Sequence, residues 1–157
     1  MRKFLPLIIV GVVVLFGYFY FKGINNTAVT LDQDVKESWG NVQTSYQRRN
    51  DLIGNLVKTV KGAADFEKST LEAVITARSK ATSVTIDPTN ITPEQLAQFN
   101  QAQSGVSSAL SRLLVTVEQY PDLKANQNFL KLQDELASTE NQILTARTRF
   151  NEAVKLY

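Results

Sequence analysis

The sequence predicts an all-α protein, in which an N-terminal transmembrane helix is followed by an antiparallel bundle of three to four long helices. An uncharged apolar run opens the chain, helical periodicity fills most of the remainder, and no stretch of useful length alternates as a β-strand does. The periodic segments are joined by short polar connections, which favour antiparallel neighbours and therefore a bundle.

The opening run extends from Phe4 to Phe21, eighteen positions without a charge. As a helix it would rise about 27 Å, close to the hydrocarbon thickness of a bilayer. Its far end is rich in Tyr and Phe, as an interfacial belt would be. A cleaved signal peptide is the alternative, but its apolar region is shorter and ends in small residues. We therefore expect residues 1–22 to form an uncleaved single-pass anchor, with membrane lipid as a partner.

The basic residues beside this run predict its orientation. Arg2 and Lys3 precede it, whereas only Lys22 follows it directly. The positive-inside rule then favours a cytoplasmic N-terminus. We expect the domain at residues 23–157 to lie on the other side of the membrane.

Composition limits what this domain does. The 17 basic residues of the chain include Arg2, Lys3 and Lys22, which leaves 14 in the domain against all 15 acidic residues. Beyond Arg48–Arg49 there is no basic cluster, whereas phosphate contacts need several cations. We therefore expect no nucleic acid among the partners.

The chain contains neither histidine nor cysteine. Histidine is the usual general base and the commonest metal ligand, so two common routes to catalysis are missing. No spacing of carboxylates typical of a metal loop compensates. We expect a protein that is not an enzyme, with no catalytic residue, no metal and no cofactor.

The first long segment carries apolar residues at steps of three, four or seven. This pattern predicts one helix near Ala28–Ser83, after a short polar hinge at Gly23–Thr27. The alternative is two helices that meet around Gly62–Asp65. Gly62 weakens the pattern by about 1 kcal/mol relative to alanine. The unbroken phase of the apolar stripe favours one helix.

The second segment has a clear beginning and end. Val84–Ile91 breaks the periodicity, and Thr92 then provides an N-cap, with Pro93 at the first helical position and Gln95 to close a capping box. The helix is expected to end at Tyr120, because the proline that follows cannot continue it.

A short connection at Asp122–Asn126 leads to the last predicted helix. Its apolar stripe runs from Phe129 to Tyr157 with no glycine, proline or basic stop. We therefore expect the natural C-terminus to lie beyond residue 157.

Several groups of residues resemble the LemA family of bacterial membrane-anchored proteins. They are Trp39, Tyr46–Gly62, Glu67, Leu71, Val74, Ala77–Arg78, Tyr120–Ala125, Phe129, Glu140, Ala146–Arg147 and Phe150–Asn151. The likeness covers nearly the whole chain and identifies residues 23–157 as a LemA-like domain. It implies a small bundle of long antiparallel helices on a single membrane span. Together with the orientation inferred above, we expect a protein of the bacterial inner membrane with coiled-coil-like helices and its domain in the periplasm. It implies no settled biochemical activity.

The sequence departs from the family at two places. The family usually has proline where Gly54 stands, and Tyr-Ala-x-His-Glu where Ala63–Glu67 stands. Any role that the family gives to that tyrosine or histidine is therefore in doubt here.

Charged residues fall inside the apolar stripes of the first and last helices. On a helical wheel Arg49, Glu67 and Arg78 lie within the first stripe, while Glu140 and Arg147 flank the last one. We expect their stems to pack at the edge of the core and their heads to form internal ion pairs, Glu140 being one acceptor. A ligand or partner site is the alternative.

A second face of the first helix carries Arg48, Asp51, Asn55 and Gly62, all within the LemA-like stretch. Such a face is either simply solvated or docks another protein or another copy, with Gly62 permitting close approach. We take it as the candidate protein-interaction face. The aromatic residues at helical spacing are predicted to be core: Trp39, Tyr46, Phe99, Phe129 and Phe150.

These inferences favour a membrane-anchored scaffold or protein-interaction module of the cell envelope that self-associates or binds other membrane proteins. The alternative is a ligand-sensing or regulatory extracytoplasmic bundle, which would act through a partner membrane protein because the chain has only three residues before the apolar run.

Overall fold

A computed structural model of the chain describes residues 5–63 and 66–157, with side chains from residue 11 onward. The described residues form helices and no strands, so the predicted all-α class is confirmed. The helices are α1 (Leu5–Lys61), α2 (Lys68–Ser83), α3 (Pro93–Val117), α4 (Pro121–Lys124) and α5 (Gln127–Leu156).

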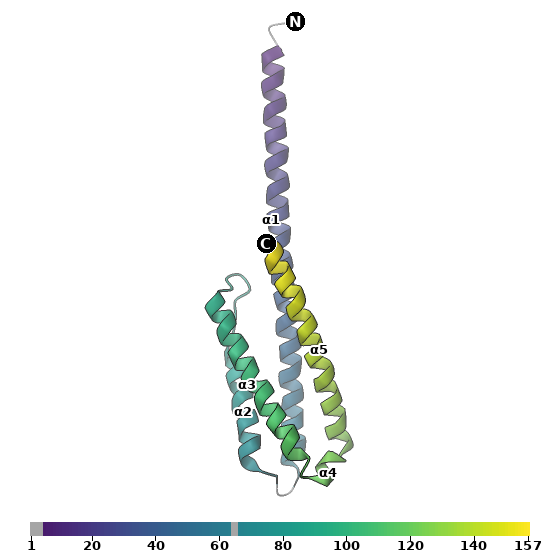
Figure 1. The fold of residues 1–157 in the computed structure, drawn as a ribbon. Helices are drawn as coiled ribbons and strands as arrows, with labels where there is room; N and C mark the ends of the chain where they lie inside the picture. Colours follow the sequence, from purple (N-terminus) through teal and green to yellow (C-terminus); the bar gives the residue numbers. More distant parts are fainter. Residues whose placement is uncertain (1–4, 64–65) are drawn as a thin grey trace.

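The four long helices form an up-and-down bundle in which α1 packs mainly along α5, and α2 packs mainly along α3 (Figure 1). Successive helices run in opposite directions, as their short connections predicted. The bundle takes only the C-terminal part of α1. The N-terminal part projects as a single rod beyond the other helices (Figure 1).

Helix α1 spans 57 residues, about 85 Å at the usual rise. The polar hinge predicted at Gly23–Thr27 is wrong, because this segment is helical. Hydroxyl groups here bond back to the helix: Thr27 Oγ1 donates to the Gly23 carbonyl at 3.0 Å, and Thr30 Oγ1 to the Asn26 carbonyl at 2.9 Å. One glycine costs a helix only about 1 kcal/mol, and the segment Gly23–Thr27 contains no proline.

The predicted anchor falls partly outside the described chain. Residues 1–4 are not described, and neither are the side chains of residues 5–10. Over the described part of the chain, no helix combines the length and apolar content needed to cross a bilayer. The anchor and its boundary at residue 22 stay predictions. The side chains that are described, from Val12 to Phe21, are exposed along the projecting rod, and Phe16 reaches 75%.

The favoured single helix at Ala28–Ser83 is wrong, and the alternative of two helices is correct. Helix α1 ends at Lys61, where Gly62 N–H and Ala63 N–H bond to carbonyls in the preceding turn. Helix α2 then folds back, so Leu71 and Val74 enter the same cluster as Val60. The apolar phase continues through the turn because both helices face one core.

The connection predicted at Val84–Ile91 leads into a helix that begins as the sequence predicted. The Thr92 side chain accepts a hydrogen bond from Gln95 N–H, and the Gln95 side chain accepts one from Thr92 N–H. These two bonds confirm the capping box, with Pro93 in the first turn. Helix α3 ends at Val117, and three turn-type backbone bonds carry the chain to Tyr120.

The single-turn helix α4 begins at Pro121 and takes up the first part of the connection predicted at Asp122–Asn126. Asn126 then caps α5 by accepting from Asn128 N–H and Phe129 N–H.

The loop between α2 and α3 is attached to the bundle at Ile86, which is buried and whose carbonyl accepts from Gln43 Nε2 at 3.3 Å. At the exposed tip of this loop, the Thr89 hydroxyl and the Thr89 N–H both donate hydrogen bonds to Asp87 Oδ1. These two hydrogen bonds, with a smaller effect of Lys36, lower the pKa of the Asp87 carboxyl below its ordinary value of 3.8.

The core has two halves. The half nearer the projecting rod is aromatic: Trp39 lies 5.3 Å from Phe99 and 5.0 Å from Phe150, and Tyr46 lies 5.0 Å from Phe99, all between ring centroids. The half nearer the α1–α2 turn is largely aliphatic and contains Phe129. All five aromatic residues predicted for the core are buried.

Candidate interaction site

A polar layer separates the two halves of the core. It consists of Arg49 from α1, Gln103 from α3 and Thr139 from α5, all buried. Each lies one helical turn from apolar residues on both sides, such as Tyr46 and Leu52 around Arg49. The sequence placed Arg49 inside an apolar stripe, and the structure puts it at the centre of the bundle.

The Arg49 guanidinium is enclosed by acceptors from two other helices. Its Nη1 donates to Glu140 Oε1 at 3.0 Å and to Ser107 Oγ at 3.2 Å. Its Nη2 donates to the carbonyl oxygen and the side-chain oxygen of Gln103. The guanidinium carbon also lies 4.9 Å from the centroid of the Tyr46 ring, a cation–π distance. The predicted pair between Arg49 and Glu140 is thus present, with Gln103 and Ser107 completing it.

This layer joins helices and offers little to a ligand. The Arg49 side chain is 2% exposed, whereas that of Glu140 is 45% exposed. Arg49 Nε and Asn50 Oδ1 are buried without a hydrogen-bond partner among the described residues.

Arg78 of α2 has a different environment, at the seam with α1. Its Nε donates to the Asn50 carbonyl at 2.8 Å. Its guanidinium lies over Gly54, where an added Cβ would sit 3.3 Å from Nη2. No carboxylate of the described residues lies within ion-pair distance of it, so the internal ion pair expected for Arg78 stays a prediction. Its partner is a backbone carbonyl.

The remaining two predicted ion-pair residues lie outside the core. Glu67 is exposed at the N-cap of α2 and accepts from the Ser69 hydroxyl, because the chain has turned back before it. Arg147 is exposed on α5, at the rim of a narrow pocket over Trp39 and Phe150. Glu67 was placed on the wheel of a single first helix, which in fact ends before it. Arg147 was expected beside the apolar stripe of the last helix, but the buried stripe is narrower than expected.

The candidate interaction face is on the surface. Arg48, Asp51, Asn55 and Gly62 are all exposed. Asp51 accepts from Gln47 Nε2 at 3.1 Å. With Asn55 it lines a groove of about 420 Å³ between α1 and α2. The other described residues that line this groove are Gly54, Val57, Lys58, Ile75 and Arg78.

Sequence reasoning missed the α2 side of this groove. Ile75 and Arg78 approach the α1 face only because the chain folds back after Lys61. The available signal was Gly62 together with the alternative of two helices, which placed the turn correctly.

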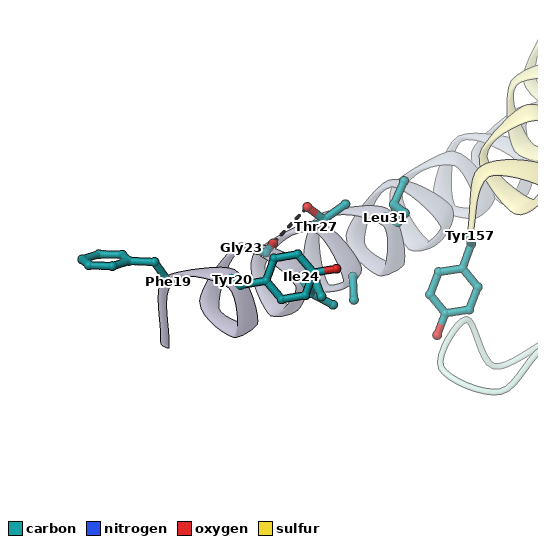
Figure 2. Close-up of a pocket in the computed structure, with 8 residues that line it drawn as sticks. Phe19, Tyr20, Gly23, Ile24, Thr27, Leu31 and Tyr157 are labelled. Atoms are coloured by element: carbon teal, nitrogen blue, oxygen red, sulfur yellow. Dashed lines mark hydrogen bonds between the residues drawn. The ribbon is translucent and has the colours of Figure 1, made fainter. Parts of the chain in front are cut away.

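Two further surfaces lie between α1 and α5. One is a polar groove of about 480 Å³ lined by Asn41, Thr44, Ser45, Ser138, Asn141, Gln142, Thr145, Ala146 and Arg149. The other is apolar and lies where the rod leaves the bundle, with Tyr20, Ile24 and Leu31 on α1 and Tyr157 at the end of α5 (Figure 2). Within the described residues, no cluster of three metal-ligating side chains is found.

The chain is similar in sequence to known proteins over most of its length. The chain is 26% identical to Protein LemA of Metamycoplasma hominis over 134 residues, 85% of the chain and 58% of that protein. It is 28% identical to Magnetosome protein MamQ 2 of Paramagnetospirillum magneticum, and 27% identical to Magnetosome protein MamQ of Magnetospirillum gryphiswaldense, each over 84% of the chain and 55% of the relative. The chain therefore spans little more than half the length of the curated relatives it matches.

The family model described as the LemA family matches residues 38–157. That range includes the polar layer around Arg49, the α1–α2 turn and the whole of α2, α3, α4 and α5. The chain therefore belongs to the LemA family.

Proposed function

We propose that this protein is a single-pass, membrane-anchored helical bundle that acts by binding other proteins or further copies of itself, without catalysing a reaction. The observation that carries the proposal is the continuity of α1. One helix begins in the apolar N-terminal run, projects from the bundle and then supplies one wall of the core (Figure 1). A continuous helix holds the bundle at a set distance from the apolar run more firmly than a flexible linker would.

Exposed side chains on the rod support the anchor. Val13, Leu15, Phe16 and Phe19 are each more than half exposed on a helix with no described partner along this part. A continuous exposed apolar surface of this kind is costly in water and is typical of a membrane or protein contact. Thirteen Val, Ile, Leu or Phe residues in the run favour insertion by about 4 to 8 kcal/mol.

Two charges placed in the rod test this part of the proposal. Val13→Lys with Leu15→Lys costs insertion about 5 to 7 kcal/mol, comparable to the whole favourable term. We expect the full chain to stay in the pellet after alkaline carbonate extraction of membranes and the double variant to be released. Val115→Lys with Leu144→Lys is the matched control, since both residues are exposed and apolar on the bundle. Release of the unaltered chain would contradict the anchor.

The interaction role rests on the α1 face of Arg48, Asp51, Asn55 and Gly62. A family-like signature on an exposed face has no packing reason to be there. Asp51→Ala with Asn55→Ala should keep the helical circular dichroism signal and change the size of crosslinked assemblies of the full-length protein. Native mass spectrometry of detergent-solubilised protein then distinguishes copies of this chain from other partners, and an unchanged assembly would remove this face from the proposal.

The polar groove between α1 and α5 favours a second function, that of a ligand-sensing bundle. Its described lining is rich in amide and hydroxyl groups, with Arg149 as its one cation and no carboxylate. Such a lining suits a hydroxylated or anionic small molecule. Asn41→Leu with Asn141→Leu should leave assembly unchanged and abolish any ligand-induced rise in melting temperature, whereas the interaction role predicts no such rise in the parent chain.

A further inference from the structure

The seam between α1 and α2 is less tightly closed than the other two seams at which these helices pack in the described bundle. These two helices contact each other less extensively than α1 with α5 or α2 with α3. Two adjoining grooves follow the seam, of about 420 and 480 Å³, and Ile75 lines both of them. The two grooves meet at Ile75 on the outside of the molecule, and together they are called the channel below.

The floor of this channel is apolar. Ile75 is 46% exposed at its centre, although it lies on a helix whose other large apolar residues, Leu71 and Val74, are buried. Val57 from α1 and Phe66 from the turn are partly buried beside it. A single exposed isoleucine is ordinary on a protein surface. Here it continues an apolar strip that is hollowed between two helices, which is the usual form of a docking groove.

The rim of the channel carries an excess of positive charge. Among the described lining residues four are cations, Lys58, Lys61, Lys68 and Arg78, against two carboxylates. None of the four takes part in an ion pair within the described chain. One of the two carboxylates, Asp51, already accepts a hydrogen bond from Gln47.

Arg78 is the most specific of these cations. Its Nε is held by the Asn50 carbonyl, and Nη1 and Nη2 lie against Gly54 in the groove. A guanidinium fixed through one nitrogen, with its other edge toward a groove, is oriented to bind a carboxylate through two hydrogen bonds. The absence of a side chain on Gly54 keeps that edge accessible.

The position of the channel favours a protein over lipid headgroups. Lys58 lies 37 residues along α1 from Phe21, about 55 Å of helix, whereas salt screens surface charge over about 8 to 10 Å. The lining of α2 runs from Lys68 to Arg78, about 15 Å of helix. That length suits a partner helix that inserts apolar residues at helical spacing and places acidic residues at the rim.

We propose that the α1–α2 channel binds an amphipathic helix of a partner protein, with apolar residues of that helix on Ile75 and its carboxylates on Lys58, Lys68 and Arg78. This inference rests on the proposed interaction function and names the chemistry of its partner. A second copy of this chain and a lipid headgroup are the competing occupants.

Photocrosslinking from the channel floor tests the proposal in the full-length protein in its own membrane. p-Benzoylphenylalanine replaces Ile75 in one variant and Val115, 69% exposed on α3, in the matched control. We expect the Ile75 probe to crosslink a helix of another protein whose mapped sequence is acidic on one face, and the Val115 probe to give no such product.

Charge reversal makes the result specific. Lys58→Glu with Lys68→Glu should lower the Ile75 crosslink at least tenfold. Lys80→Glu with Lys155→Glu, which changes net charge equally at exposed sites outside the channel, should leave it unchanged. Changing the mapped carboxylates of the partner to lysine should restore the crosslink to the reversed channel. Circular dichroism confirms that each variant is folded.

Any of four results overturns the proposal: no crosslink, a crosslink insensitive to the channel charges, a crosslink mapped to this chain, or one to lipid. Carbonate extraction of the same samples shows separately whether the protein is anchored. Loss of the crosslink in an anchored protein defeats the channel alone, whereas an extractable protein defeats the anchor.

Discussion

The two seams of α1 use arginine in opposite ways. At the seam with α5, Arg49 is enclosed by Glu140 of that helix and by Gln103 and Ser107 of α3. At the seam with α2, Arg78 bonds to one backbone carbonyl and leaves the rest of its guanidinium at an open groove. The difference teaches that an arginine in an apolar stripe stabilises a bundle when other helices supply its acceptors. Where they do not, it marks a surface that another molecule can complete.

The largest test of this comparison removes the sealed arginine. Arg49→Ala leaves a buried void and deprives the Gln103 side chain of its donor, so we expect a loss of about 3 kcal/mol in the free energy of unfolding. Urea denaturation followed by circular dichroism measures it. Arg48→Ala, on the exposed neighbour, should cost under about 0.5 kcal/mol. Equal effects of the two substitutions would show that the polar layer does not stabilise the bundle.

The next test concerns Gly54, where the family usually has proline. Proline in a helix interior costs about 3 kcal/mol, partly because the carbonyl four residues earlier loses its donor. At position 54 that carbonyl belongs to Asn50 and already accepts from Arg78. We expect Gly54→Pro to cost about 1 kcal/mol and Gly40→Pro, in the same helix, about 3 kcal/mol. The difference in cost between Gly54→Pro and Gly40→Pro should shrink when each is combined with Arg78→Ala. Thermal unfolding measures the two single and the two double variants.

A smaller effect is expected when the open arginine itself is removed. Arg78→Ala loses one hydrogen bond to a carbonyl that keeps its helical partner, so the free energy of unfolding should fall by about 1 kcal/mol. The same substitution should weaken the photocrosslink from position 75 strongly. A loss of stability as large as that of Arg49→Ala would place Arg78 among the structural residues and end the contrast between the seams.

The smallest effect lies outside both seams, in the loop that joins α2 to α3. Because hydrogen bonds from Thr89 lower the pKa of Asp87, its ionised form stabilises the fold above the ordinary value of 3.8, and that stabilisation is lost as the pH falls through the lower pKa of the folded state. The free energy of unfolding of the parent chain and of Asp87→Asn should be measured from about pH 6 to about pH 2. We expect the parent chain to be more stable at the higher pH and this difference to become smaller in acid. A constant difference would contradict this.

Much of the fold followed from local signals in the sequence. The apolar stripes predicted the long helices, and Thr92, Pro93 and Gln95 predicted one helix start because a capping box is made within four residues. The turn after Lys61 was harder, since a stripe that faces one core keeps its phase whether the helix continues or folds back. The hinge at Gly23–Thr27 failed because polar residues with helix-compatible side chains do not by themselves end a helix.

The candidate site divides in the same way. The pairing of Arg49 with Glu140 could be predicted because both lie beside apolar stripes. The partner of Arg78 could not be predicted, because it is a backbone carbonyl and every residue has one, whatever its side chain. Glu67 does not pack at the edge of the core as expected, because the chain has already turned before it.

By itself the sequence determined the class of protein, the number of long helices to within one, most of their ends and the residues of the core. These depend on periodicity and caps, which act over a few residues. Only the tertiary structure decided that α1 and α2 are separate, which helices share a seam and which arginine is enclosed. Those outcomes depend on acceptors and surfaces supplied by segments far apart in the chain. A local sequence pattern does not show which of these segments lie close together in space.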